Sequence, residues 1–337
     1  MTEIIEVPTT TNTTSKLQAL INKTGNISAK YIFPAMKITV DVPLTYYNNT
    51  EFAGSGINST IFKLMKDAPT TIFKEGTPLL APKNPTAAEN IIIHDIAFDG
   101  TRDSQAYVKK LYNKPWGHGY HNILMLGVFG NPAYTNTKNC KLYNLSFKDS
   151  LGDGIRAEGI YNVTIHDIYG ERVGHDLICL VADTASVYKV KAKIDVNAGI
   201  RTRSARNVKM WDCEIDGSGG TAYSPGFEVQ STASNWKSYN IEIWNCYVHD
   251  TFGPGVQIIG TVPNNSDIQI HHCVFENCGE MPPANKLPYV GGVVFDGFNN
   301  IKIYSNDFIG CLGNSVSNAK YDIAGSMSGL TAEVYNN

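Results

Sequence analysis

Residues 199–230 read GIRTRSARNVKMWDCEIDGSGGTAYSPGFEVQ, and this stretch decides the fold. It holds a short segment over 199–203, an Asn-led segment over 207–215, a glycine-rich loop, and another short segment that ends at Gln230. Apolar residues alternate with other residues in each segment, which predicts strands with one buried face. A polar residue interrupts the middle of 207–215, so we expect a bend there between two short strands.

The Asn-led segment recurs along most of the chain. Its pattern is asparagine or aspartate, apolar, any, apolar, any, polar, apolar or cysteine, any, apolar. A repeat of roughly two dozen residues with three short strands and no helix is typical of a parallel β-helix, whose rungs stack about 4.8 Å apart. The leucine spacing of a leucine-rich repeat is absent from the copies, and a β-propeller would need four antiparallel strands in each repeat. The copies begin at positions 90, 139, 162, 207, 240, 267 and 300.

The beginning of the chain predicts a short helix over residues 15–25. Ser15 can cap this helix, Leu17 and Ile21 fall on one face, and Gly25 can end it. Stacked strands expose both their core and their edge at an open end. We therefore expect the helix to cover the first rung.

Length and composition favour one elongated all-β domain over residues 1–337, with β-helix turns from about residue 30 to about residue 320. The hydrophobic fraction of 42% suffices for a core, and the charged fraction of 18% is low for amphipathic helices. A net charge of −3 predicts neither a nucleic acid nor an anionic membrane as partner. No apolar run reaches the length of a membrane span.

A second short strand precedes most Asn-led copies, and its outward positions carry the strongest functional signal. If Ile155, Leu177, Ile200 and their counterparts point inward, the residues that follow them point outward. Arginine can bind a uronate carboxylate through two parallel hydrogen bonds, and Asp or Glu can act as acid or base. An alternative interpretation is that the same charges only pair and keep the sheet face soluble. The outward set is Arg156, Glu158, Ile178, Leu180, Arg201, Arg203, Glu228, Gln230, Gln257, Val294 and Asp296.

Three further candidates, Asp153, His175 and Asp176, lie just before these strands. Asp176 is two rungs from Glu228, roughly 9–10 Å, which is near the carboxylate separation of inverting glycosidases. Asp153 and Asp176 are one rung apart, roughly 5 Å, which would suit a retaining pair. We therefore predict Asp176, Glu228 and Asp153 as catalytic candidates. The predicted substrate-binding residues are Arg156, Glu158, His175, Arg201, Arg203, Gln230 and Gln257.

The opening of the chain, with its helix and its Gly54-Ser55-Gly56 turn, resembles the start of pectate-lyase-like right-handed β-helix proteins. The Asn-Ile-x-Ile copies continue this resemblance through residue 308, so it covers nearly the whole chain. It implies cleavage of acidic polysaccharides by hydrolysis or elimination. The polygalacturonase motifs are matched only partly, by Gly174-His175-Asp176 and Gly199-Ile200-Arg201, and the calcium-binding acidic cluster of pectate lyases is not evident.

Within this group, the sequence is similar to the archaeal disaggregatases. That similarity implies a substrate containing uronate and amino sugars, such as methanochondroitin. It also implies a location outside the cell or at its surface, with a secretion signal that is missing from this sequence. We predict no metal at the site and no cofactor, and a structural Ca²⁺ stays an open alternative.

These observations leave three functions open. The first is an endo-acting glycoside hydrolase on an acidic polysaccharide. The second is a polysaccharide lyase that uses the same outward residues, where an arginine neutralises the uronate and a base removes the C5 proton. The third is a non-catalytic β-helix that binds glycan or serves as a structural part.

Overall fold

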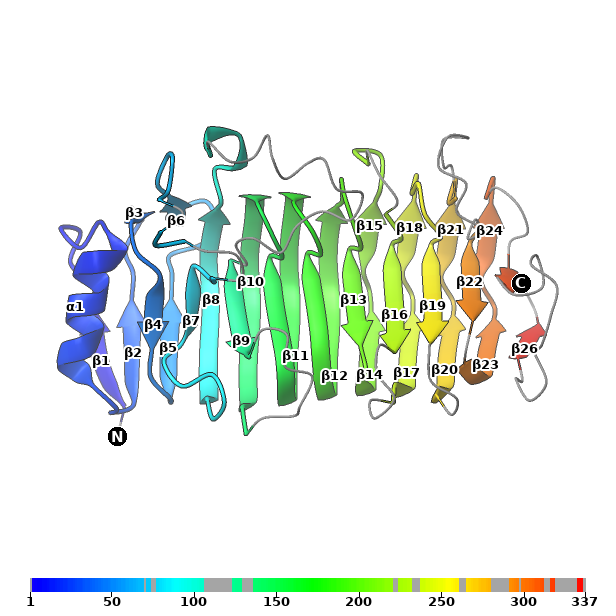
Figure 1. The fold of residues 1–337 in the computed structure, drawn as a ribbon, viewed down its shortest axis with the longest axis horizontal. Helices are drawn as coiled ribbons and strands as arrows, with labels where there is room; N and C mark the ends of the chain where they lie inside the picture. The colour runs from blue at the N-terminus through cyan, green and yellow to red at the C-terminus, as the bar shows by residue number, and fades with distance from the viewer. Residues whose placement is uncertain are drawn as a thin grey trace.

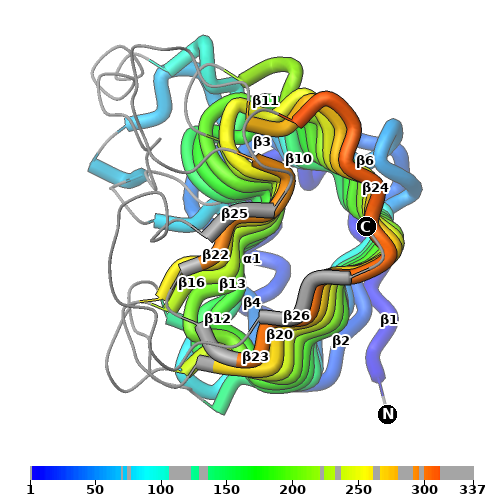
Figure 2. Tube along the Cα trace, turned by 90° about the vertical axis from the view of Figure 1, so that its right-hand side faces the viewer, coloured from blue at the N-terminus to red at the C-terminus, as the bar shows by residue number. Residues whose placement is uncertain are grey.

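The computed structural model shows a solenoid with three sheet faces. Figure 1 shows the rungs side by side from the N-terminal to the C-terminal end, and Figure 2 shows the strands of each face superposed when viewed along the axis. All described pairings between strands are parallel. The predicted all-β, right-handed parallel β-helix is confirmed. The structure describes residues 2–69, 71–73, 77–105, 123–128, 136–220, 224–231, 237–260, 265–279, 291–296, 298–311, 316–318 and 332–335.

The strands sort into three faces by their pairing. The site face contains β4 (Leu44–Tyr46), β7 (Leu80–Pro82), β9 (Leu124–Gly127), the first parts of β11 (Ile155–Val173) and β12 (Ile178–Lys193), β13 (Ile200–Arg203), β16 (Phe227–Ser231), β19 (Val256–Gly260), β22 (Val293–Asp296) and β25 (Val316–Asn318). The second face contains β1 (Glu3–Glu6), β2 (Ala29–Ile32), β5 (Thr50–Ala53), β8 (Glu89–Asp99), β10 (Lys138–Ser150), the middles of β11 and β12, β14 (Arg206–Trp211), β17 (Tyr239–Trp244), β20 (Asn265–His271), β23 (Phe298–Tyr304) and β26 (Ala332–Tyr335).

The third face contains the shorter strands that follow the central bend. Strands β8, β10, β11 and β12 run through that bend and so belong to the second and third faces at once. A 3₁₀ turn, η1 (Arg102–Ser104), follows β8. The remaining strands of the third face are β3 (Met36–Val40), β6 (Thr60–Leu64), β15 (Glu214–Asp216), β18 (Tyr247–His249), β21 (Val274–Glu276) and β24 (Asp307–Ile309).

Helix α1 (Thr14–Thr24) lies at the N-terminal end of the solenoid, as predicted (Figure 1). Its N-cap is Thr13, whose backbone is extended and whose hydroxyl accepts a hydrogen bond from a first-turn amide. The predicted cap, Ser15, lies inside the helix, and its hydroxyl donates to Asp41. Gly25 ends the helix with a positive φ of 64°, as predicted.

The bends explain why six of the seven copies begin with asparagine. Asn139, Asn162, Asn207 and Asn240 all have φ between 52° and 57°, a left-handed conformation that asparagine tolerates well. Their side-chain amides also bond from rung to rung, because Asn162 donates to Asn139 at 2.8 Å and Asn240 donates to Asn207 at 2.8 Å. The repeated asparagine therefore belongs to the scaffold.

The core is a continuous column of buried apolar side chains between the three faces. Rings stack within it, with the centroids of Phe98 and Phe147 5.3 Å apart. A second column of stacked rings, in strands of the second face, consists of His94, Tyr143, His166, Tyr188, Trp211, Trp244, His271 and Tyr304. Within the described ranges, no helix has the length and apolar character needed to cross a membrane.

Candidate functional site

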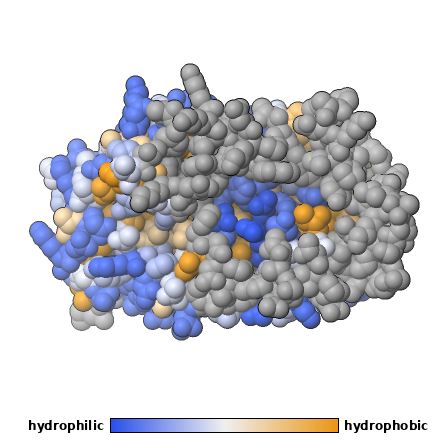
Figure 3. Space-filling view, in the orientation of Figure 1, coloured by the Kyte–Doolittle hydropathy of each residue, from blue (hydrophilic) through white to orange (hydrophobic). Residues whose placement is uncertain are grey.

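The charged and amide residues of the predicted outward set form a polar strip on the outer side of the site face. Arg201 of β13 pairs in register with Glu228 of β16, and Arg203 pairs with Gln230. Glu228 pairs in turn with Gln257 of β19. Figure 3 shows hydrophilic side chains gathered near the middle of this face, over β13 and β16. The predicted placement of these residues on adjacent rungs is therefore correct.

One rung of the strip differs from the prediction. Ile178 and Leu180 of β12 are fully buried in the core, whereas the prediction had them facing outward. Cys179 and Val181 occupy the outward positions of this rung, and Cys179 lies in register with Arg201. A neutral rung therefore separates the charged residues of β11 from those of β13.

The difference arises because the alternation of β12 begins one residue later than we expected. Ile178 pairs with Ile155 and Ile200, so Leu177 lies before the strand. A Cβ on Gly154 or Gly170 would meet the side chain of Leu177 within 3.0 Å. Leu177 occupies the position that Gly154 and Gly199 have on the neighbouring rungs. The prediction was therefore offset by one residue along β12 and assigned each side chain of this rung to the wrong face.

The first half of the charged network is centred on Arg156. Its Nη1 lies 2.6 Å from Oδ2 of Asp153, and its Nη2 lies 2.6 Å from Oε1 of Glu158. The other oxygen of Asp153, Oδ1, lies 2.6 Å from Nδ1 of His175 and also accepts a hydrogen bond from the Asp176 amide at 3.0 Å. Asp153 thus joins an arginine on its own rung to a histidine on the next.

The second half of the network is centred on Asp176 and Arg201. Oδ2 of Asp176 lies 3.1 Å from Nδ1 of His175 and 3.3 Å from Nη1 of Arg201. Asn197 donates to the other oxygen of Asp176 at 2.7 Å. Nε of Arg201 donates to Oε2 of Glu228 at 2.9 Å. Arg201 therefore bridges Asp176 and Glu228, the two residues predicted to be acid and base.

The electrostatics keep this network charged. Burial would raise the pKa of Asp153, but Arg156 and His175 outweigh burial and hold that pKa well below its ordinary value. Burial would lower the pKa of His175, but Asp176 and Asp153 raise it to about 9. Burial also opposes the charge of Arg201, yet Asp176 and Glu228 keep its pKa above the ordinary range. At neutral pH the site therefore combines carboxylates, guanidinium groups and an imidazolium.

Accessibility differs sharply along the strip. Asp153 and Asp176 are fully buried, and Arg156, Glu158, Glu228 and Gln257 are exposed by 5% or less. The side chains of His175 and Arg201 are each 14% exposed, and that of Arg203 is 31% exposed. Gln230 is partly buried. Arg203 and Gln230 therefore form the accessible edge of a network whose carboxylates lie underneath.

Two residues of the site were not among the predicted site residues, Asn197 and Cys179. Leu177 and Gly199 occupy equivalent positions on neighbouring rungs. His175 lies two residues before Leu177, and Asn197 lies two residues before Gly199, so these two residues are also equivalent. Aligning the residues before each strand would have found Asn197. Cys179 was missed because the prediction took Leu177 as the inward residue and so placed Cys179 inside. Burial raises the pKa of the Cys179 thiol above the ordinary range.

Two groups of described residues bring ligand atoms within 4.8 Å of one another, as a metal ion requires. They are Asp153 with His175 and Asp176, and Asp216 with His249 and Asp250. In the first group, Asp153 and Asp176 already pair with arginine and with the protonated His175. A divalent cation would compete with these cations for the same oxygens. The prediction of no metal at the site stays a prediction.

The raised pKa of His175 predicts that the protein loses stability at alkaline pH. The folded-state pKa of about 9 lies above the ordinary value of 6.5, so the contribution is complete below about pH 6.5 and is lost as pH rises through 9. We expect the free energy of unfolding to fall by up to about 3 kcal/mol between pH 6 and pH 10 because of this residue. Urea unfolding of the wild type and of His175→Gln at both pH values measures it, and an equal fall in both proteins would contradict the assignment.

Fold and site together define a right-handed parallel β-helix with a charged network on one sheet face. The chain belongs to the family described as the right-handed β-helix region, whose model matches residues 127–337. No curated protein matches the chain. The predicted resemblance to right-handed β-helix proteins is therefore confirmed at the level of family and fold.

Solved structures with this fold include three proteins whose names refer to polysaccharides. The A-module of mannuronan C-5 epimerase AlgE4 from Azotobacter vinelandii is 14% identical, with a TM-score of 0.61 over 95% of each chain. An alginate lyase from Paenibacillus sp. str. FPU-7 is 9% identical, with a TM-score of 0.58 over 99% of this chain and 98% of that one. An endo-xylogalacturonan hydrolase from Aspergillus tubingensis is 12% identical, with a TM-score of 0.57 over 98% and 95%.

Proposed function

We propose that this protein is a polysaccharide depolymerase, an endo-acting glycoside hydrolase that cleaves an acidic glycan outside the cell or at its surface. The substrate would contain uronate and amino sugars, as methanochondroitin does. The observation that carries the proposal is Arg201, held between Asp176 and Glu228 with Arg203 and Gln230 beside it. Enzymes that act on polysaccharides are among the structures with this fold, which supports the substrate class.

The proposed recognition step uses the arginines of β13. Arg203 is the most accessible cation of the network, and a uronate carboxylate can pair with its guanidinium through two hydrogen bonds. A second contact to Arg201 would compete with the carboxylates that hold Arg201 now. The substrate carboxylate would therefore displace Glu228 and Asp176 from Arg201 as it binds. Binding of the uronate would then free the two groups that carry out the reaction.

The proposed chemical step uses Asp176 and Glu228 as acid and base, in an order that we leave open. Asp176 precedes β12 and Glu228 lies in β16, so their main chains are two rung steps or roughly 9–10 Å apart, near the carboxylate separation of inverting enzymes. The Arg201 guanidinium now lies between the two carboxylates and would have to give way to the attacking water. Asp153 is fully buried and stays ionised, so we assign it the positioning of His175 and Arg156. The network lies between β9 and β22, away from either end of the solenoid, which is compatible with endo cleavage.

Elimination is the second candidate, and a specific feature favours it. Among the described carboxylates predicted to be catalytic, only Glu228 has any exposed surface. A lyase needs one base at C5 and a cation on the uronate, and Glu228 with Arg201 and Arg203 meets that need. The same residues would then break the bond without an attacking water.

Product analysis distinguishes these functions. The protein is incubated with polygalacturonate, alginate, hyaluronan, chondroitin and methanochondroitin, and products are analysed by size and mass. We expect shortened chains in which each new pair of ends has gained one water. An unsaturated uronate end with its ultraviolet absorbance would establish elimination and overturn the hydrolase, and no shortening of any of these chains would overturn the depolymerase.

A further inference from the structure

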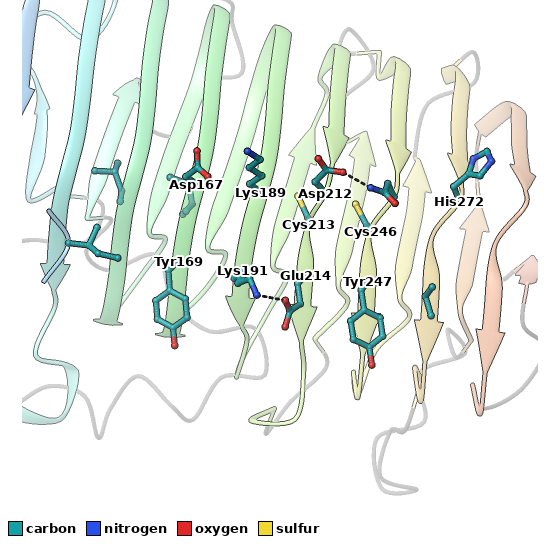
Figure 4. A pocket seen from close by; sticks show the side chains of 15 residues that line it. Asp167, Tyr169, Lys189, Lys191, Asp212, Cys213, Glu214, Cys246, Tyr247 and His272 are labelled. Atoms are coloured by element: carbon teal, nitrogen blue, oxygen red, sulfur yellow. Dashed lines mark hydrogen bonds and ion pairs between the residues drawn. The ribbon is translucent and has the colours of Figure 1, made fainter.

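A groove of about 770 Å³ runs across several rungs on the other side of the molecule from the strip. It follows the central bend and the third face, and no member of the charged network lines it. Figure 4 shows its side chains, which come from successive strands along the axis. The residues that matter most are Tyr169, Lys189, Lys191, Asp212, Glu214 and Tyr247.

Two tyrosines mark the groove as a binding surface. Only six large hydrophobic side chains are exposed among the described residues, and Tyr169 at 40% and Tyr247 at 37% are two of them. Both line the groove, and Figure 4 shows their rings extending the same way from their strands. An exposed aromatic ring supplies a rigid apolar platform with a polar tip, which is common where proteins bind ligands.

The two tyrosines occupy one register position on different rungs. Tyr169 pairs with Lys191, Lys191 with Glu214, and Glu214 with Tyr247. Three rung steps separate the rings by about 14 Å, because each step is about 4.8 Å. This distance equals the length of a short oligosaccharide, so one sugar chain laid along the axis would reach both rings.

The orientation of each ring is held by a hydrogen bond to a carboxylate. The Tyr169 hydroxyl donates to Glu171 at 2.9 Å, and the Tyr247 hydroxyl donates to Glu276 at 2.5 Å. Tyr247 also stacks on His249, with centroids 4.5 Å apart. Rings that are already fixed lose little conformational entropy when a ligand binds.

The polar groups between the tyrosines suit hydroxyl groups better than anions. Lys191 and Glu214 lie on the two rungs between the rings and form an ion pair 2.7 Å long, with side chains 69% and 43% exposed. Such a pair offers both donors and acceptors to sugar hydroxyls. Counted over the lining, the carboxylates of Asp167, Asp212 and Glu214 outnumber the ammonium groups of Lys189 and Lys191.

We infer that this groove binds a segment of uncharged polysaccharide, with Tyr169 and Tyr247 stacking on sugar rings and Lys191 and Glu214 bonding hydroxyls between them. The lining carries one more carboxylate than ammonium group, which disfavours a uronate chain, so we expect the groove and the strip to take chemically different glycans. The inference does not rest on the proposed hydrolysis, because it concerns another surface and a binding event alone. The groove would anchor the protein on a neutral polymer.

The test is calorimetric titration with neutral hexasaccharides of β-1,4-linked glucose, xylose, mannose and N-acetylglucosamine. We expect at least one to bind, and the double variant Tyr169→Ala with Tyr247→Ala to bind it at least tenfold more weakly. Tyr247→Phe keeps the ring and should retain most of the affinity. The matched control is Tyr161→Ala, a partly buried tyrosine of the same strand as Tyr169 that does not line the groove.

Three results would overturn the inference. The first is the failure of all four hexasaccharides to bind the wild type at millimolar concentration. The second is unchanged binding by the double alanine variant when its circular dichroism matches the wild type. The third is binding of a trigalacturonate that is lost in the double alanine variant, because the groove would then take a uronate. None of these results depends on catalytic activity, so they leave the proposed hydrolysis to its own test.

Discussion

Replacing Glu228 with glutamine is expected to lower kcat on the acidic polysaccharide by about 10²–10⁴-fold, the usual contribution of a general acid or base. The amide keeps the volume of the side chain and an oxygen that can accept from Nε of Arg201, which now lies 2.9 Å from the carboxylate. It cannot take up a proton from water or from the sugar. The fold should persist because the backbone of β16 is unchanged between β13 and β19.

Initial rates of chain shortening, with circular dichroism of each variant, measure this effect. Glu242→Gln is the matched control, because Glu242 belongs to β17 on the second face and pairs there with Lys209 and His271. It should retain the wild-type rate. If Glu228→Gln depolymerises the substrate at a rate within a few-fold of the wild type, Glu228 is not a reacting group and the site lies elsewhere.

Replacing Asp153 with alanine is expected to lower the free energy of unfolding by about 3–5 kcal/mol, the range for breaking a buried ion pair from one side. The change leaves Arg156 with one carboxylate instead of two and removes one of two carboxylates from His175. It also leaves the buried Asp176 amide without the oxygen that accepts from it. These groups cannot regain water because their surroundings are buried.

Urea unfolding at neutral pH measures the loss, with the transition midpoint compared between variants. Asp183→Ala serves as the control, because Asp183 pairs with Arg206 at 2.8 Å but both side chains are partly exposed, at 19% and 30%. Exposed pairs contribute about 1 kcal/mol or less, so this variant should shift the midpoint far less. Equal shifts in the two variants would contradict the role given to the buried network.

The fold was predictable because its signal is periodic and local. Alternation by two identifies strands, and the asparagine before each copy identifies the bend where a left-handed residue is needed. The seven starting positions then imply stacked rungs, and the structure has them. The helix cap was misassigned by two residues, since Thr13 and Ser15 are equally suited by residue type and only the backbone conformation separates them.

The site was predictable only in its outline. Alternation identified Arg201, Arg203, Glu228, Gln230 and Gln257 as outward residues on adjacent rungs, and the register agrees. The ion pairs and hydrogen bonds among these residues could not be predicted from their spacing in the sequence. The loops between copies differ in length, and each side chain can contact more than one residue on the neighbouring rungs. Asn197 could have been found by aligning the residues before each strand, but its hydrogen bond to Asp176, 21 positions away in sequence, is visible only in the structure.

By itself, the sequence determined the repeat, the three-sided rung and the face on which the charged residues lie. These follow from local backbone preferences and from the burial of every second side chain. The tertiary structure decided that Leu177 occupies the position that glycine has on the neighbouring rungs, so that β12 begins at Ile178 in register with Ile155 and Ile200. It also decided that Arg201 bridges Asp176 and Glu228, and that Tyr169 and Tyr247 share one groove. Such contacts depend on how separate turns stack, since stacking brings together residues that the chain keeps far apart.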